Sequence, residues 1–156
     1  MSRAGIGYDI HRLAKGRRLV LGGVAIEHPM GLQGHSDGDV LLHALMDALL
    51  GAANLGDIGR HFPSDDPAYA EARSTELMRR VGGLVREHGF TVSSLDATVI
   101  AQAPRVAPHV QAMRESIAEA LEIDVDRVSV KATTNDGLGV VGAGEAIAVL
   151  AIAQLE

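Results

Sequence analysis

The residues best suited to chemistry gather in the stretch from residue 35 to 66, where histidine, aspartate and serine follow one another closely. Residues 40–55 within it are mostly strong helix formers. Asp39, His43 and Asp47 are spaced by four residues, so a helix places them on one face. This polar stripe on an otherwise apolar helix indicates either a buried site or a solvated surface face, and the helix alone leaves both open.

A second group of candidate ligands lies near the N-terminus. Residues 4–10 alternate like a β-strand, which places Asp9 and His11 on the same face at the strand's end. The opposite face carries the apolar side chains of Ile6, Tyr8 and Ile10. If the helix packs on this strand, Asp9, His11 and His43 supply two imidazoles and a carboxylate, the ligand set of an open catalytic zinc site. A turn aspartate bonded to a nearby histidine is the alternative.

A third cluster, Thr133, Thr134, Asn135 and Asp136, directly follows a β-branched segment. Hydroxyls, exposed amides and a carboxylate together suit a phosphate and a hard cation such as Mg²⁺. The glycine-rich run that follows, GLGVVGAGE, lacks the G-x-G-x-x-G spacing and the strand-to-helix context of a dinucleotide-binding loop. We therefore exclude a Rossmann fold.

Composition limits the possible functions. The 156 residues form one domain in the simplest interpretation, residues 1–156, with 47% hydrophobic residues and only 3% aromatic ones. The absence of cysteine excludes disulfides and thiolate metal sites, so any metal must be bound by histidine or carboxylates. The net charge of −6 and the lack of a basic stripe argue against nucleic acid. No run is long and apolar enough for a membrane span and no secretory leader is evident, so we expect a cytoplasmic protein.

The remaining pattern predicts the elements that position these residues. Ser36 or Asp37 is expected to cap the helix at 40–55. Residues 18–26 predict a hairpin that turns at Gly22-Gly23, and residues 27–34 and 57–69 are expected to be loops. Further helices are predicted at 74–88 and 109–121, and further strands at 94–102, 128–133 and 146–152. This order favours an α+β fold, a mixed sheet backed by helices.

Four motifs occur in a specific order: GYDIHRL, HSDGDVLLHALMDALLGAANLGDIGRHFP, IAQAPR and VKATT. Together they resemble the 2-C-methyl-D-erythritol 2,4-cyclodiphosphate synthase family over essentially the whole chain. The resemblance implies a homotrimer whose sheets face the threefold axis and whose active sites lie between subunits. It also implies a lyase of the non-mevalonate isoprenoid pathway. This enzyme converts 4-diphosphocytidyl-2-C-methyl-D-erythritol 2-phosphate to the 2,4-cyclodiphosphate and releases CMP.

The resemblance also assigns roles by motif position. His35 and Thr134 would be catalytic, Asp9, His11 and His43 would bind one Zn²⁺ per subunit, and Asp136, where the family usually has Glu, would contact Mg²⁺ or Mn²⁺ on the diphosphate. Residues around the metals and the methylerythritol would be Asp9, His11, His35, Ser36, Asp57, Ile58, Gly59, Phe62, Pro63, Ser64, Asp65 and Asp66. Residues around the cytidine and the diphosphate would be Ala101, Gln102, Ala103, Pro104, Arg105, Val106, Ala107, Thr133, Thr134, Asn135 and Asp136, with Val140 and Ala143 in the loop near the trimer axis.

Two of these positions depart from the family pattern: Val140 stands where an aromatic residue is common, and Ala143 where an arginine is common. Binding of an isoprenoid diphosphate in a central cavity is therefore in doubt, because that arginine would pair with the anion. Asp39 and Asp47 are expected either to support the site by hydrogen bonds or to be solvated. Bystander roles are expected for His28, His61, His88 and His109, and a structural salt bridge is expected for Lys131.

Two rival functions stay open. One is a zinc-dependent phosphoester hydrolase that uses metal-bound water, and the other is a nucleotide-binding trimer without catalysis. The products formed from the diphosphocytidyl substrate distinguish the three.

Overall fold

A mixed five-stranded sheet forms one layer of the molecule, and the computed structural model describes all residues from 1 to 156. The strands are β1 Arg3–Lys15, β2 Leu19–Leu21, β3 Val24–Ile26, β4 Met30–Leu32, β5 Val92–Ile100, β6 Val128–Thr133 and β7 Ala146–Leu155. The α-helices are α1 Val40–Ala52, α2 Ile58–His61, α3 Ser74–Glu87, α4 Val110–Leu121 and α5 Gly139–Gly142. Short 3-10 helices are η1 Pro67–Tyr69, η2 Ala107–His109 and η3 Val125–Arg127.

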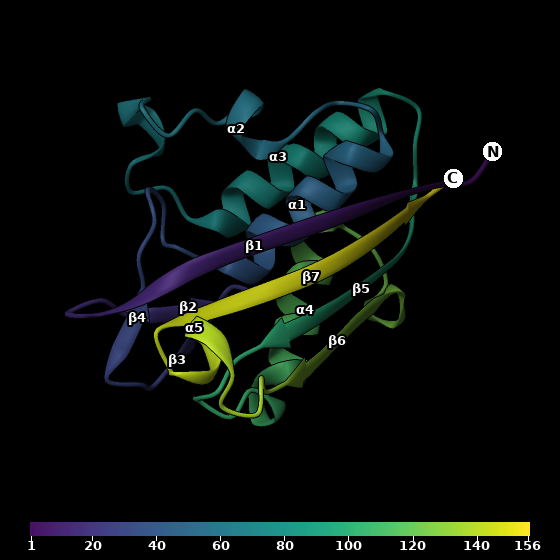
Figure 1. The fold of residues 1–156 in the computed structure, drawn as a ribbon. Coiled ribbons are helices and arrows are strands. Elements are labelled where there is room, and N and C mark those ends of the chain that lie inside the picture. Colours follow the sequence, from purple (N-terminus) through teal and green to yellow (C-terminus); the bar gives the residue numbers. More distant parts are fainter.

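The sheet has the strand order β4-β1-β7-β5-β6, and only β5 and β6 run parallel. Figure 1 shows the chain ends β1 and β7 side by side in this sheet, paired from Arg3 opposite Leu155 to Arg12 opposite Ala146. The β2–β3 hairpin stands apart from the sheet. The prediction of a single-domain α+β fold with a mixed sheet and backing helices is confirmed.

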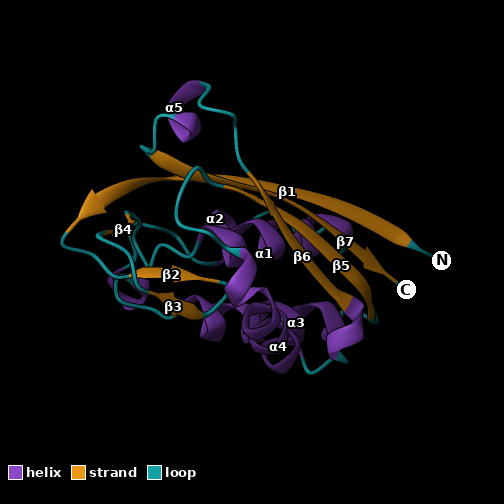
Figure 2. Ribbon diagram, turned by 90° about the horizontal axis from the view of Figure 1, so that it is seen from below, coloured by secondary structure: helices purple, strands orange, loops and turns teal.

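The two faces of the sheet differ sharply. Figure 2 shows α1, α3 and α4 on one side of the sheet and α5 on the other. The face without the three long helices exposes five large apolar side chains of β1 and β7, namely Ile6, Tyr8, Ile10, Leu150 and Ile152. The strand alternation expected for residues 4–10 is therefore confirmed, with the glycines and Asp9 toward the helices and the apolar side chains outward.

Helix α1 is the centre of the core, since eleven of its 13 residues are buried. Its N-cap is Asp39, whose side chain accepts a hydrogen bond from Leu42 N at 3.0 Å, so the expectation of Ser36 or Asp37 at this position is wrong. The physical reason is that Asp37 caps another segment, the start of α3, by accepting from Ser74 N. The helix ends at Ala52, three residues before the predicted end, and the following Asn54 adopts a positive φ of 59°.

Glycine on β1 allows α1 to approach the sheet closely. A Cβ on Gly5 would overlap the carbonyl oxygen of Ala48, and a Cβ on Gly7 would overlap that of Ala44. Because Ala44 directly follows His43, this close packing brings the histidine beside Asp9, which lies in the middle of the observed strand and not at its end as predicted.

Several predicted elements are confirmed: the hairpin, the helices near 74–88 and 109–121, the strand at 128–133 and the last strand, which continues to Leu155. Strand β1 is longer than predicted, and β4 lies within residues expected to be a loop. Both differences have one cause, because Leu13 and Lys15 pair with Leu32 and Met30, a contact that local sequence does not specify. The loops at 57–69 and 134–145 contain the short helices α2, η1 and α5. None of the helices is both long and apolar enough to cross a membrane.

Candidate active site

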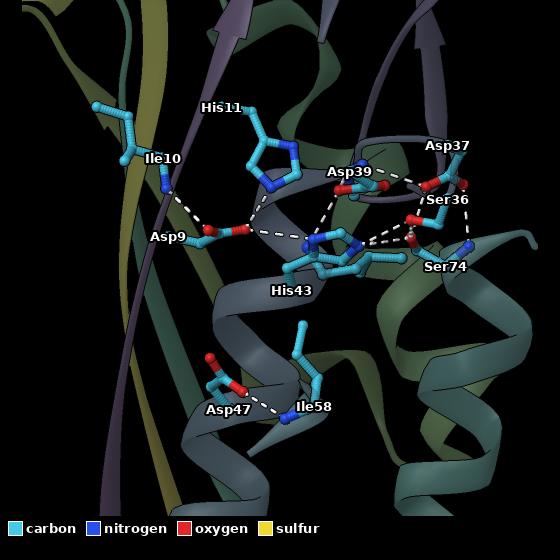
Figure 3. A network of polar contacts seen from close by, with 12 residues as sticks. Asp9, Ile10, His11, Ser36, Asp37, Asp39, His43, Asp47, Ile58 and Ser74 are labelled. Carbon is cyan, nitrogen blue, oxygen red and sulfur yellow. Dashed lines mark hydrogen bonds and ion pairs between the residues drawn. The ribbon is translucent and has the colours of Figure 1, made fainter. Parts of the chain in front are cut away.

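Three potential metal ligands converge from two elements, as Figure 3 shows. Asp9 and His11 lie on β1, and His43 lies on α1. Asp9 Oδ2 is 2.8 Å from His11 Nε2 and 3.2 Å from His43 Nδ1. One ligand atom from each residue lies within 4.8 Å of the other two. The structure therefore brings together the three residues that the sequence suggested.

The charges of this cluster favour an ionised carboxylate. Burial raises the pKa of Asp9, but the close contacts with His11 and His43 outweigh it and lower that pKa to about 2. Burial likewise lowers the pKa of His43, but the contact with Asp9 and the negative charges of Asp9, Asp39 and Asp37 outweigh it and raise that pKa. The side chains are largely shielded, with 13% of His11, 11% of His43 and 26% of Asp9 exposed.

These residues fit a divalent cation. Asp9 Oδ2 and His11 Nδ1 are buried, and neither has a hydrogen-bond partner of acceptable geometry. Asp9 Oδ2 therefore sits close to two ring nitrogens without the alignment that an N–H donor would give. Two imidazole nitrogens and a carboxylate oxygen are also the donor set that zinc prefers when it keeps a further position open.

The other ring nitrogen of His43 faces serine hydroxyls (Figure 3). His43 Nε2 lies 3.0 Å from Ser36 Oγ and 3.2 Å from Ser74 Oγ. Ser36 was expected to contact substrate phosphate, and the structure places its hydroxyl against His43. Ser74 was not identified as a site residue from the sequence, because it lies 31 residues after His43 and no local pattern links the two.

A cavity of about 510 Å³ opens beside His43 and contains most of the loop residues expected to bind methylerythritol. Its lining includes His35, Ser36, Ile58, Gly59, Phe62, Pro63, Ser64 and Asp65. Asp57 and Asp66 instead cap local turns, by accepting from Arg60 N at 3.0 Å and Ala68 N at 2.9 Å. His35 Nε2 lies 3.2 Å from the carbonyl oxygen of Asp66, which ties the two ends of this segment together.

Tyr69 and Leu77 also line this cavity and were missed from the sequence. Tyr69 packs edge-on against Phe62, with ring centroids 5.3 Å apart. The chain has only four aromatic residues of the Phe and Tyr types. Two of them lie in the polar loop at residues 57–69, and this pattern could have indicated from the sequence that Tyr69 belongs to the cavity with Phe62. A separate hollow of about 560 Å³ is lined by Arg17, Arg18 and Arg73 but contains none of the three ligands, so we place the site in the smaller cavity.

The carboxylates of Asp39 and Asp47, beside the cluster, accept hydrogen bonds from backbone N–H groups. Asp39 is fully buried and accepts from Gly22 N and Gly23 N at 2.9 and 2.7 Å, which anchors the β2–β3 hairpin to α1. Asp47 accepts from Ile58 N at 2.8 Å, which fixes the start of the cavity loop. The solvated alternative for Asp39 is therefore wrong. Lys131 pairs with Asp96 at 2.8 Å, as expected for a structural role.

The residues expected to bind cytidine and diphosphate lie elsewhere on the same chain. Asp9 shares a row of the sheet with Val149, Val99 and Ala132, so Thr133 is about three strand spacings, roughly 14 Å, from the metal cluster. This set consists of residues 101–107 and 133–136. Gln102 Oε1 accepts from Gly137 N at 3.4 Å, which joins the first segment to the residue directly after the second. Within the second segment, Asp136 has a φ of 51° and its N–H donates to Thr134 Oγ1 at 3.2 Å. Val140 and Ala143 are exposed in the α5 loop.

Comparison with known proteins gives a consistent result. The model of the YgbB family matches residues 2–156. The chain is 59% identical to the 2-C-methyl-D-erythritol 2,4-cyclodiphosphate synthase of Azotobacter vinelandii over 98% of each chain. It resembles the bifunctional IspDF from Campylobacter jejuni with a TM-score of 0.96 and 45% identity, over 99% of this chain but only 42% of that longer one. It also resembles a 2C-methyl-D-erythritol-2,4-cyclodiphosphate synthase in its CDP-bound form, with a TM-score of 0.90, 36% identity and coverage of 99% and 100%.

Proposed function

The chain belongs to the YgbB family, and from this premise we propose that it is a phosphorus–oxygen lyase of isoprenoid biosynthesis. Its reaction converts 4-diphosphocytidyl-2-C-methyl-D-erythritol 2-phosphate to 2-C-methyl-D-erythritol 2,4-cyclodiphosphate and CMP. An oxygen of the 2-phosphate attacks the β-phosphorus, and the bond from that phosphorus to the oxygen bridging to CMP breaks. The nucleophile belongs to the substrate, so the chain needs no covalent nucleophile of its own.

The observation that carries this proposal is the convergence of Asp9, His11 and His43 beside a loop-lined cavity. We propose that these three residues bind Zn²⁺, one per subunit. When bound, such a cation offsets phosphate charge and polarises a phosphorus–oxygen bond. The two phosphates repel each other, so holding them in line is the main task, and good orientation is worth about 7–11 kcal/mol at best.

The loop residues have positioning roles in this proposal. Ile58, Gly59 and residues 62–65 line the cavity, which suits the methylerythritol part of the substrate. Its wall combines backbone and small polar groups with the rings of Phe62 and Tyr69, so it contacts both hydroxyls and the methyl group. His35 also lines the cavity, and its proposed role is to donate to phosphate oxygens, which requires its Nε2–H to exchange the Asp66 carbonyl oxygen for a phosphate oxygen.

The cytidine and diphosphate residues are proposed to act across a subunit interface. Within one chain they are separated from the metal cluster by β7 and β5, so one copy does not close a complete site. A homotrimer whose sheets face the threefold axis would cover the exposed apolar side chains of β1 and β7 and bring Thr133, Thr134 and Asp136 to the next subunit's cluster. Asp136 would contact Mg²⁺ or Mn²⁺ on the diphosphate. The cytoplasmic location stays a prediction from the sequence.

Product analysis tests the reaction. The purified protein, supplied with Zn²⁺ and Mg²⁺, is incubated with the diphosphocytidyl substrate, and products are followed by ³¹P NMR. We expect CMP and a cyclic diphosphate in equal amounts. An open-chain phosphate would indicate the hydrolase, and unchanged substrate the non-catalytic nucleotide-binding protein.

Mixed oligomers test the shared site. His43→Ala and Thr134→Ala are each expected to abolish turnover, and subunits carrying them are then mixed by mild dissociation and reassociation. If the site is shared, some interfaces combine an intact His43 with an intact Thr134, and part of the activity returns. Lack of recovery in oligomers shown by mass spectrometry to be mixed would contradict a shared site.

A further inference from the structure

The imidazole of His43 is held from the side opposite Asp9 by a buried polar group. Its Nε2 atom contacts the hydroxyls of Ser36 and Ser74, and these two oxygens are 3.4 Å apart. Over all atoms of each residue, Ser74 is completely buried, and Ser36 and His43 are each 9% exposed. Water is therefore a poor substitute for these contacts.

The direction of the hydrogen bonds follows from the last member of this group. The hydroxyl of Ser74 donates to Asp37 Oδ1. A carboxylate only accepts hydrogen bonds, so the single proton of Ser74 is committed to Asp37. Toward His43, the Ser74 oxygen can then only accept. The Nε2 atom of His43 must carry a proton to complete this contact.

Asp37 is itself fixed in place by the backbone on two sides. Its Oδ2 accepts from Ser74 N at 2.9 Å, and its Oδ1 accepts from Asp39 N at 3.1 Å. It therefore joins the turn before α1 to the first residue of α3, two segments that are distant in sequence. Arg17 Nη2 also donates to the carbonyl oxygen of Ser36 at 3.2 Å, which holds the same turn.

We propose that Asp37 and Ser74 are positioning residues that fix the Nε2–H tautomer of His43 and keep its Nδ1 lone pair directed at the metal position. A neutral imidazole has two tautomers, and only the one protonated on Nε2 leaves Nδ1 free to bind a cation on the side of Asp9 and His11. At many metal sites a carboxylate accepts directly from the second nitrogen of a ligand histidine. Here the hydroxyl of Ser74 lies between the carboxylate of Asp37 and the imidazole of His43. This inference rests on the proposed metal site and deepens it.

Zinc-loaded protein without substitutions gives the first test. In long-range ¹H–¹⁵N spectra we expect His43 to show a metal-bound Nδ1 and a protonated Nε2 whose proton exchanges slowly with water. Binding through Nε2, or an Nε2 proton that exchanges as fast as in a free imidazole, would overturn the inference. This measurement does not depend on how a variant folds.

Zinc affinity of variants, measured with Zn²⁺ alone against a competing chelator, gives the second test. Ser74→Ala is expected to weaken binding about 10–100-fold, the usual effect of removing such support. Ser74→Thr restores a hydroxyl and is expected to restore affinity. Ser116→Ala in α4 removes a partly buried serine hydroxyl outside this group, and we expect affinity equal to that of the parent.

The outcomes separate the two proposals. If the parent protein fails to bind Zn²⁺, the metal site is wrong and this inference with it. If the parent binds and Ser74→Ala binds equally well, or if Ser74→Thr is as weak as Ser74→Ala, only the positioning role is overturned.

Discussion

His43 Nδ1 faces Asp9 Oδ2 at 3.2 Å, although the two residues belong to different elements and are far apart in the chain. The pair is made possible by Gly7, since a side chain there would push α1 away from β1. The relationship connects the packing of the core to the proposed chemistry, and several predictions test that connection.

Removing the helix ligand should separate catalysis from folding. We expect His43→Ala to lose zinc binding and turnover while the oligomer measured by sedimentation is unchanged, because the polar contacts of this side chain are with the cluster and its serine partners. His88→Ala removes an exposed histidine at the end of α3 and serves as control, with parental activity expected. Full activity of His43→Ala would refute the zinc role.

The metal-free cluster should make stability depend on pH. The lowered pKa of Asp9 stabilises the fold above its unfolded value of 3.8, and this contribution disappears as the pH falls toward 2. The raised pKa of His43 stabilises the fold below 6.5, and this contribution disappears as the pH rises through the folded value.

Urea unfolding of chelator-treated parent and Asp9→Asn checks this expectation. The stability advantage of the parent should be largest between about pH 4 and 6.5 and should shrink on both sides. An advantage that is constant from pH 3 to 9 would show that the ion pair does not contribute.

Asp47 should act on substrate binding through the loop. Asp47→Ala leaves the Ile58 N–H without its acceptor, at a cost of about 1–3 kcal/mol, and loosens the start of the cavity wall. We expect KM to rise several-fold with a smaller change in kcat and an unchanged zinc affinity. Asp47→Asn keeps an acceptor oxygen, so its KM should lie between those of the parent and Asp47→Ala. A loss of zinc affinity equal to that of His43→Ala would place Asp47 in the metal site instead.

Gly7→Ala tests the close packing of strand and helix. The added methyl group overlaps the Ala44 carbonyl, so we expect a loss of about 1–3 kcal/mol or more in the free energy of unfolding, together with weaker zinc binding. Gly51→Ala in α1 meets no atom within 4 Å and should be neutral or stabilising by up to about 1 kcal/mol. Equal stability and equal zinc affinity in both variants would show that the Gly7 contact does not position His43.

Local sequence was sufficient for much of the architecture. The hairpin at Gly22-Gly23, the helix that starts at Ser74 and the strand at Val128–Thr133 are recognised because periodicity, turn residues and caps are properties of neighbouring residues. The candidate metal ligands were also identified, since Asp9 and His11 share a strand face and the motifs around His43 resemble a known family.

Tertiary structure decided the rest, because contacts between distant segments have no local pattern. Strand β4 exists only through its pairing with Leu13 to Lys15, and Asp39 became the cap of α1 because Asp37 is committed to Ser74. Ser74 entered the site through packing alone. The sequence by itself determined which residue types are available for chemistry. Only the fold decided which nitrogen of His43 faces Asp9 and which atoms hold it there, because that depends on how β1, α1 and α3 pack in three dimensions.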